Sequence, residues 1–261
     1  MKRTLLDIVP DTFPEKVVKF VGNAKIYDSS CSPEARVYFV DKDAGYYVKT
    51  AAAGMLSREA LMTDYFHKKG FGARVVDYGT RGADFLITER VAGEDRTHAR
   101  YLDDPKRLCD TLANELRCLH ELDASDCPVK DRVGEYLALA ERNFCTGNYD
   151  KSHFPDSFGY RSAEEAHAAL KAGEGALKNE VLLHGDYCLP NVMLDDWRLA
   201  GFIDVGNGGI GDRHVDVFWG AWTLWFNLGT DAYRDRFFDA YGRELIDTDK
   251  LKTVAAAEVF G

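Results

Sequence analysis

The sequence of 261 residues contains no C-x-x-C pair and no apolar run long enough to cross a bilayer. Its six cysteines are scattered, which fits reduced thiols in a cytosolic protein rather than a disulfide framework or a zinc site. The opening stretch "MKRTLLDIVPDTFP" is a poor secretory signal, because acidic residues and proline interrupt it. We therefore expect a cytoplasmic location.

Positive charge is also in short supply, since the formal net charge is −10 and the pI about 5.2. This balance argues against partners that need a basic surface, so we expect no nucleic-acid partner and no membrane partner. It suits a small-molecule partner that is itself cationic. An apolar fraction of 46% is enough for a real core. We expect a monomer or a weak dimer.

The first third of the chain is rich in β-type segments. Residues 15–50 are interpreted as strands, separated by the turn-prone "SSCSPE" and "DKDAG". A helix is predicted from about Ser57, its N-cap, to Lys69, because Leu56, Ala60, Leu61 and Tyr65 recur at helical spacing. Two more strands are predicted over "ARVVDYG" and "DFLITERV".

Helical patterns dominate the remainder. Asp104 is a predicted N-cap, followed by Pro105 at the first helical position and by leucines on one stripe. Helices are predicted over residues 105–122, 131–145, 161–172, 213–228, 231–242 and 248–259. The fold class is thus α+β, with a β-rich domain over 1–91 and a larger helical domain over 92–261, joined near Glu89–Gly93.

One strong β signal interrupts the helical part. In "HGDYCLPNVMLDDWRLAGFIDVG", the segments "NVML" and "LAGFID" flank Asp195-Asp196 and predict a hairpin. Asp186 and Asn191 have the D-x-x-x-x-N spacing that is typical of a kinase catalytic loop, and Asp204 stands where kinases place a metal-binding Asp before Gly.

This spacing suits phosphoryl transfer. Divalent cations take oxygen ligands, which Asn191 and Asp204 could supply from adjacent strands. A separate carboxylate, Asp186, could accept the proton of the attacking hydroxyl. The alternative interpretation makes His184 a core histidine and the two Asp residues loop-capping groups.

The nucleotide side has weaker signals. Lys49 ends a strand and could reach phosphates if a carboxylate such as Glu59 held it; alternatively both are ordinary surface residues. The glycine-free loop "SSCSPEARVY" could bind phosphate through backbone N–H groups and the hydroxyl of Ser30 or Ser32, or it is an ordinary hairpin turn. Tyr47 shares a strand face with Lys49 and could lie against adenine or belong to the core.

Taken in order along nearly the whole chain, five segments resemble the aminoglycoside phosphotransferase family, and most of all its 3′-phosphotransferase (kanamycin kinase) branch. They are "SPEARVY", "ELDASDCP", "HGDYCLPNVML", "GFIDVGNGGIGDRHVDV" and "AAEVF". The resemblance implies a protein-kinase-like bilobal fold with a small N-terminal and a larger C-terminal lobe. It implies an ATP-dependent (or GTP-dependent) kinase with Mg²⁺ that confers antibiotic resistance.

The resemblance also implies roles for single residues. Asp186 would be the catalytic base, and Asn191 and Asp204 would ligate Mg²⁺. Lys49, paired with Glu59, would hold the α- and β-phosphates. On the base side, Tyr47 would stack on adenine and the backbone near Glu89–Val91 would form the hinge.

Two departures concern the acceptor. Asn207 stands where the 3′-branch usually has Arg, and the helix after Asp216 is aromatic where the branch usually has polar groups. Its aromatic residues are core, or contact the acceptor as Trp222 and Phe226 could. The acidic candidates for a cationic acceptor are Asp156, Glu164, Glu165 and Glu258. An aminoglycoside 3′-hydroxyl is the first expectation; an amino alcohol, macrolide or sugar, and a nucleotide-binding pseudokinase, are the alternatives.

Overall fold

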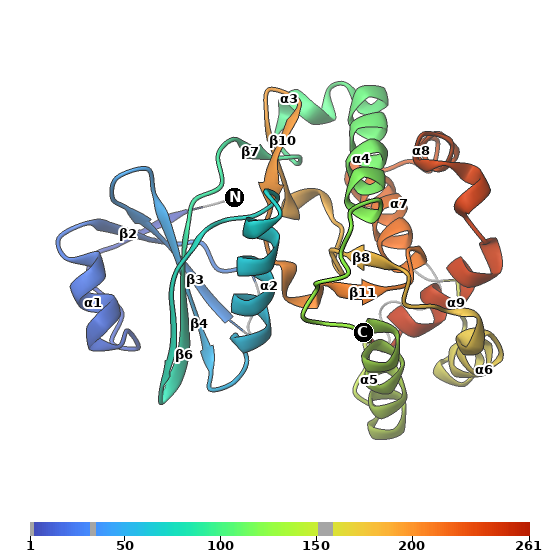
Figure 1. The fold of residues 1–261 in the computed structure, drawn as a ribbon, viewed down its shortest axis with the longest axis horizontal. Coiled ribbons are helices and arrows are strands. Elements are labelled where there is room, and N and C mark those ends of the chain that lie inside the picture. The colour runs from blue at the N-terminus through green and yellow to red at the C-terminus, as the bar shows by residue number, and fades with distance from the viewer. Residues whose placement is uncertain (1–2, 32–34, 151–158) are drawn as a thin grey trace. The chain divides into compact units, whose positions relative to one another are not determined.

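A computed structural model of the protein describes residues 3–31, 35–150 and 159–261 (Figure 1). Contacts divide the chain into two compact units, Met1–Arg96 with Pro190–Asn207, and Thr97–Leu189 with Gly208–Gly261. The division into domains 1–91 and 92–261 stays a prediction; the sequence did not indicate that Pro190–Asn207 belongs with the first unit. Within the described ranges, no helix is long and apolar enough to cross a membrane.

The first unit is built on an antiparallel sheet that has six strands among the described residues, in the order β1-β2-β3-β4-β6-β5. Its strands are β1 Thr4–Leu6, β2 Lys25–Asp28, β3 Ala35–Asp41, β4 Tyr46–Ala52, β5 Val75–Arg81 and β6 Ala83–Glu89. The register places Lys49 opposite Leu86 and Tyr47 opposite Thr88. Because side chains alternate along a strand, Tyr47 and Lys49 lie on the same face of β4, as predicted.

The segment before β2 is a helix, α1 Glu15–Val21, and the prediction of strands from residue 15 onward was wrong there. Pro14 precedes the helix, Gly22 ends it, and Val17 and Val21 are buried one turn apart. The two valines join Phe13 in a cluster with Val48 and other residues of the sheet. Their β-branched side chains suggested a strand, but burial at helical spacing decides the structure.

Helix α2, Ser57–Lys68, lies close to β5, and its Ala60 joins Leu56, just before the helix, and Leu86 of β6 in a second buried cluster. Two details of its prediction were wrong. Ser57 is the first helical residue and not the N-cap, which is Leu56. Leu61 is 46% exposed, because Met62 and Phe66 occupy the buried face instead.

The predicted hairpin forms a small sheet with β7 Glu94–Asp95, in the order β10-β9-β7. Strands β9 Val192–Asp195 and β10 Arg198–Phe202 are joined by Asp196 and Trp197, whose φ values of 45° and 67° give the backbone of a tight two-residue turn. Gly93, at φ 79°, lets β7 approach β9, since a Cβ there would lie 2.1 Å from the Leu194 carbonyl oxygen.

The second unit is mainly helical, and each long helix predicted there is present. Helix α4 begins at Pro105, and the Asp104 side chain caps it by accepting from Arg107 N at 3.3 Å. Its helices are α3 Ala99–Leu102, α4 Pro105–His120, α5 Arg132–Thr146, α6 Ala163–Gly173, α7 His214–Leu228, α8 Arg234–Tyr241 and α9 Thr248–Glu258. The pairs α4–α8, α6–α9 and α7–α9 pack together.

A two-stranded ladder of β8 Val181–Leu183 and β11 Gly209–Gly211 completes this unit. The sequence did not predict it, since each strand has three residues and β11 consists of two glycines around Ile210. Strand β8 leads directly into His184 and Asp186. The ladder therefore fixes where the predicted catalytic loop begins.

Candidate active site

Lys49 on β4 lies between two carboxylates of the first unit. Its Nζ is 2.7 Å from Oε2 of Glu59 on α2 and 3.0 Å from Oδ1 of Asp204, which follows β10. The predicted Lys49–Glu59 pair is confirmed, whereas Asp204 as a second partner was not foreseen. Lys49 and Glu59 are mostly buried, while the Asp204 side chain is 52% exposed.

Burial and charge act in opposite directions on this cluster. Burial lowers the pKa of Lys49, but Asp204 and Glu59 outweigh it, so the pKa lies above its ordinary value. Burial raises the pKa of Glu59, with Asp204 adding to the rise and Lys49 opposing it. Lys49 is therefore a protonated ammonium at neutral pH, held by two carboxylates of which one is exposed to solvent.

Asn191 and Asp204, the predicted metal ligands, come together through the hairpin. The N–H of Ile203 donates to the Asn191 carbonyl oxygen at 3.0 Å, so Asp204 follows the residue that pairs with Asn191. Asp204 has a φ of 57°, a left-handed backbone that is unusual for a residue other than glycine. Amide and carboxylate oxygens are donors that suit Mg²⁺, so the chemistry of the two side chains fits this ion.

The residues predicted to surround adenine lie on β4 and at the end of β6. The Tyr47 ring is 5.4 Å from that of Phe39, and its hydroxyl accepts from Arg3 Nη2 at 2.8 Å. Glu89 ends β6 and forms an ion pair with Arg74, while Val91 is buried. Ser32, predicted to contact phosphate, lies outside the described residues.

In the second unit, the backbone before Asp186 is tied to α7. The N–H groups of His184 and Gly185 donate to the two carboxylate oxygens of Asp216 at 2.7 and 2.8 Å. Asp186, predicted as the base, is half-buried and is the third residue after the end of β8. Its carbonyl oxygen accepts from Cys188 N at 2.8 Å, which closes the loop behind it.

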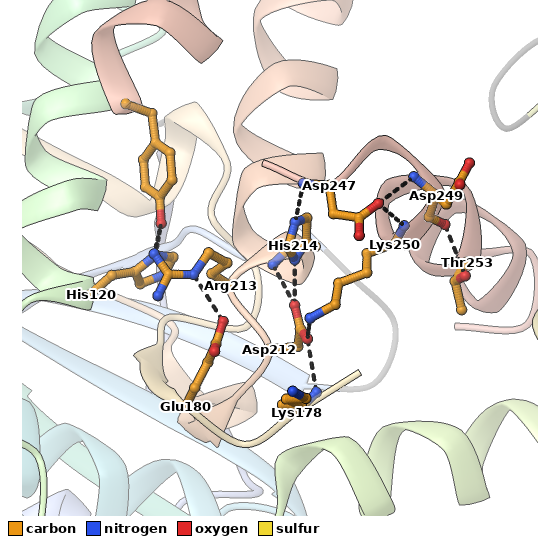
Figure 2. Close-up of polar contacts among 11 residues, drawn as sticks. His120, Lys178, Glu180, Asp212, Arg213, His214, Asp247, Asp249, Lys250 and Thr253 are labelled. Atoms are coloured by element: carbon orange, nitrogen blue, oxygen red, sulfur yellow. Dashed lines mark hydrogen bonds and ion pairs between the residues drawn. The ribbon is translucent and has the colours of Figure 1, made fainter. Parts of the chain in front are cut away.

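Asp216 also belongs to a side-chain network that runs from the buried His120 to the exposed Glu180, and Figure 2 shows its members His120, Arg213 and Glu180. His120 Nε2 is 3.2 Å from Asp216, and His120 Nδ1 is 2.7 Å from the Tyr241 hydroxyl. That hydroxyl accepts from Arg213 Nη1 at 3.4 Å, and Arg213 Nε donates to Glu180 at 2.9 Å.

The network has one consistent arrangement of protons. The Asp216 carboxylate can only accept, so His120 carries its proton on Nε2, and Nδ1 accepts from Tyr241. Burial lowers the pKa of His120 despite the opposing effect of Asp216, which keeps the imidazole neutral. Burial raises the pKa of Tyr241 to about 12, so its hydroxyl remains a donor. Sequence reasoning missed His120 and Tyr241; the only signal was the His in "LRCLHELDASDCP".

The other Asp of the "GDRHVD" segment holds α7 to α9 (Figure 2). Asp212 accepts from His214 Nδ1 at 2.5 Å, from Lys250 Nζ at 2.9 Å and from the N–H of Lys178 at 2.8 Å. His214 Nε2 in turn accepts from Asp247 N, the N-cap of α9, at 2.8 Å. Asp212 and Asp216 are therefore both buried acceptors that fix helices.

Glu258, an acidic candidate for the acceptor, is buried near the end of α9. Its Oε1 accepts from the Tyr136 hydroxyl at 2.7 Å and from Trp219 Nε1 at 3.0 Å. Burial raises the pKa of Glu258 to about 7, opposed by these two hydrogen bonds and assisted by the charges of Asp186 and Asp216.

The remaining predicted acceptor residues are dispersed. Trp222 stacks on Phe226 with ring centroids 4.9 Å apart, and Phe226 is 63% exposed. Glu164 and Glu165 are exposed in the first turn of α6, and Asn207 is exposed in the first unit, after Asp204. Asp156 lies outside the described residues.

Comparison with known proteins identifies the family. Residues 33–253 match the phosphotransferase enzyme family. A probable aminoglycoside 3′-phosphotransferase of Lactococcus lactis subsp. lactis (strain IL1403) is 50% identical over 252 residues, covering 96% of each chain. An aminoglycoside 3′-phosphotransferase of Streptomyces fradiae is 32% identical over 248 residues, covering 88% of each chain.

A solved structure agrees with these relatives. The crystal structure of an aminoglycoside-3′-phosphotransferase of type VIII has a TM-score of 0.74 at 26% identity, covering 89% of this chain and 92% of that one. The predicted α+β, protein-kinase-like fold is confirmed. The chain therefore belongs to the phosphotransferase enzyme family, and it is a small-molecule phosphotransferase related to the aminoglycoside 3′-phosphotransferases.

Proposed function

We propose that the enzyme transfers the γ-phosphate of ATP or GTP to the 3′-hydroxyl of an aminoglycoside antibiotic and so confers resistance. The observation that carries this proposal is the cluster of Lys49, Glu59 and Asp204. It combines a buried ammonium group with an exposed carboxylate beside the Asn191 hairpin. A nucleoside triphosphate that binds with a divalent metal needs a positive group for its phosphates and a carboxylate for the metal.

Lys49 binds the α- and β-phosphates in this proposal, and Glu59 keeps its ammonium group in place. Two observations support this role: the ion pair at 2.7 Å and the raised pKa of Lys49, which secures its positive charge. Tyr47 and the backbone from Glu89 to Val91 contact the adenine base. The hydroxyl of Ser32 is proposed to donate a hydrogen bond to the phosphates.

Asn191 and Asp204 hold Mg²⁺ through their amide and carboxylate oxygens. When bound, Mg²⁺ neutralises negative charge on the phosphate oxygens. The Asp204 side chain is 52% exposed, so it would have an oxygen available for the metal beside its ion pair with Lys49. The left-handed backbone at Asp204 supports a functional role, since such conformations concentrate at sites of ligand binding.

Asp186 accepts the proton of the attacking hydroxyl and orients it. Its support is the hydrogen-bonded backbone before it, where Asp216 accepts from both His184 N and Gly185 N. A positioned general base typically contributes about 10²–10⁴-fold to the rate.

The acceptor is proposed to be cationic because the net charge is −10 and because acidic side chains occur on α6 and α9. Glu258 is the best supported of these, since the charge of Asp186 acts on it. The other proposed acceptor contacts are Asp156, Glu164, Glu165, Asn207, Trp222 and Phe226.

A second candidate has the same chemistry but a less charged acceptor, such as a macrolide, an amino alcohol or a sugar. The Trp222–Phe226 stack favours it, because exposed aromatic faces bind apolar or sugar surfaces. The nucleotide-binding pseudokinase is less well supported, because Lys49, Glu59, Asp186, Asn191 and Asp204 are all present.

The test measures nucleotide consumption with kanamycin, neomycin, a 3′-deoxy analogue and a macrolide, with and without Mg²⁺. We expect turnover with kanamycin and none with the 3′-deoxy analogue. Turnover with the macrolide alone would replace the first candidate by the second. Asp186→Ala is the inactive control, and Asp195→Ala, an exposed residue at the end of β9, is its matched control.

A further inference from the structure

Glu59 occupies a helical position where a glutamate usually has another partner. Leu56 is the N-cap of α2 and Ser57 its first residue, so Glu59 is the third. A glutamate at this position commonly folds back and accepts from the N–H of the N-cap residue. Here Glu59 instead points to Lys49, at 2.7 Å. The N–H of Leu56 therefore needs a different acceptor.

Asp84 of β6 is that acceptor. The N–H of Leu56 donates to Asp84 Oδ2 at 2.9 Å, and Asp84 is only 1% exposed. The Thr80 hydroxyl donates to Oδ1 at 2.7 Å, and the Tyr78 hydroxyl lies 3.4 Å from Oδ2. Burial would raise the pKa of Asp84, but these groups and the N–H of Gly54 lower it below its ordinary value. The carboxylate is thus charged and fully hydrogen-bonded at neutral pH.

The pairing of β4 with β6 places Asp84 two residues along the strand from the position opposite Lys49. Asp84 lies opposite Ala51, and Leu86 opposite Lys49, on the neighbouring strands β6 and β4. Leu86 also packs with Leu56 at the start of α2. One strand therefore both pairs with the strand that carries Lys49 and anchors the helix that carries Glu59.

We propose that Asp84 is a positioning residue for the Lys49–Glu59 pair. By accepting from the N–H of Leu56, it takes the place of Glu59 in capping α2 and leaves the Glu59 carboxylate for Lys49. Without Asp84, Glu59 turns back to the N–H of Leu56 and Lys49 loses its buried partner. Asp84 does not touch the nucleotide, and the inference rests on the function proposed above for Lys49.

The test compares four full-length enzymes: wild type, Asp84→Ala, Glu59→Ala and the double variant. Each is assayed for kcat and for the nucleotide KM at saturating acceptor, with the melting temperature measured in parallel. We expect Asp84→Ala to lower kcat/KM for the nucleotide about tenfold, within the range of coupling between residues that act through a shared partner, here the N–H of Leu56. In the Glu59→Ala background the same substitution should change kcat/KM less than about twofold, because the carboxylate that it displaces is absent.

Conservative variants separate capping from general stability. Asp84→Asn keeps an oxygen for the N–H of Leu56 and should retain most of the activity. Thr80→Val removes one donor to the Asp84 carboxylate but keeps its hydrogen bond with the N–H of Leu56. It should therefore lower the melting temperature and leave kcat/KM for the nucleotide nearly unchanged. Should Asp84→Ala fail to fold, Asp84→Leu fills the same volume without an acceptor and takes its place in the cycle.

Two results would overturn the inference. Equal losses from Asp84→Ala in both backgrounds would show that Asp84 acts on stability alone and not through Glu59. A Glu59→Ala enzyme with wild-type kcat/KM for the nucleotide would instead refute the role proposed for the Lys49–Glu59 pair, and the inference would fail with it.

Discussion

Asp204 and Asp216 belong to the same continuous motif, but the two units use them in opposite ways. In the first unit, Asp204 is half-exposed and lies 3.0 Å from Lys49. In the second unit, Asp216 is fully buried and accepts from two backbone N–H groups and from His120. A carboxylate that must meet a ligand keeps oxygens available, whereas a carboxylate that holds backbone has its oxygens occupied.

The difference separates activity from stability. An ion pair with one half-exposed partner, such as that of Asp204 with Lys49, contributes little to the free energy of unfolding, because water and salt screen it. Removal of a buried acceptor leaves its donors without partners, at about 1–3 kcal/mol for each group. Substitutions in the first class should therefore lower activity at nearly constant stability, and those in the second class should lower stability first.

The largest effect should come from Asp186→Ala. The loop before it is held by Asp216, so loss of this half-exposed carboxylate should leave the fold intact and lower kcat about 10²–10⁴-fold. Single-turnover kinetics, nucleotide binding and the melting temperature measure this together. Turnover above half that of wild type would contradict the assignment of Asp186 as the base.

Asp216→Ala should have the next largest effect, and on stability. It leaves the N–H groups of His184 and Gly185 and the Nε2–H of His120 without their acceptor, at about 1–3 kcal/mol for each group, so we expect a loss of at least about 3 kcal/mol in the free energy of unfolding. Urea denaturation measures it, and Asp231→Ala on the exposed surface is the control. A loss below about 1 kcal/mol would contradict the stabilising role that distinguishes Asp216 from Asp204.

Asp204→Ala should affect binding and not folding. We expect the Mg²⁺-dependent part of the nucleotide affinity to fall at least about tenfold, while the melting temperature stays close to that of wild type. Nucleotide titrations with and without Mg²⁺ distinguish a metal ligand from a residue that only pairs with Lys49. A normal Mg²⁺ dependence in the variant would exclude Asp204 as a ligand.

Features set by local sequence could be predicted, whereas features set by contacts between distant residues could not. Short-range signals located the long helices and the hairpin, because caps, periodicity and motif spacing are local, whereas the pairing of Lys49 with Glu59 was an open alternative until the resemblance to a family implied it. The His120–Tyr241 contact joins residues 121 positions apart, and no local pattern encodes it. Helix α1 was missed because its valines have strand propensity while their burial against the sheet is a tertiary effect. From the sequence, the aromatic residues of α7 could belong to the core or contact the acceptor. In the structure, Trp219 donates to Glu258, while Phe226 is exposed.

The smallest effect tests Glu258, which combines both uses of a carboxylate. It is buried and hydrogen-bonded to Tyr136 and Trp219, yet the proposal gives it a cationic ligand. Because burial raises its pKa to about 7, Glu258 is mostly neutral below this pH and mostly ionised above it. The KM for a cationic acceptor should therefore fall a few-fold as the pH rises through about 7, and Glu258→Gln should remove this dependence.

Stability should move in the opposite direction, which separates the two uses. The folded pKa of about 7 lies above the ordinary value of 4.5, so the folded state holds the proton more tightly than the unfolded state. The stabilisation by the neutral acid is complete below about pH 4.5 and is lost as the pH rises through about 7, and Glu258→Gln should abolish this slope in urea denaturation as well. Tyr136→Phe removes a donor to the carboxylate and should shift both transitions to higher pH. If the slope in stability disappears in Glu258→Gln while the acceptor KM keeps its pH dependence, Glu258 is a buried structural acid and the cation binds elsewhere.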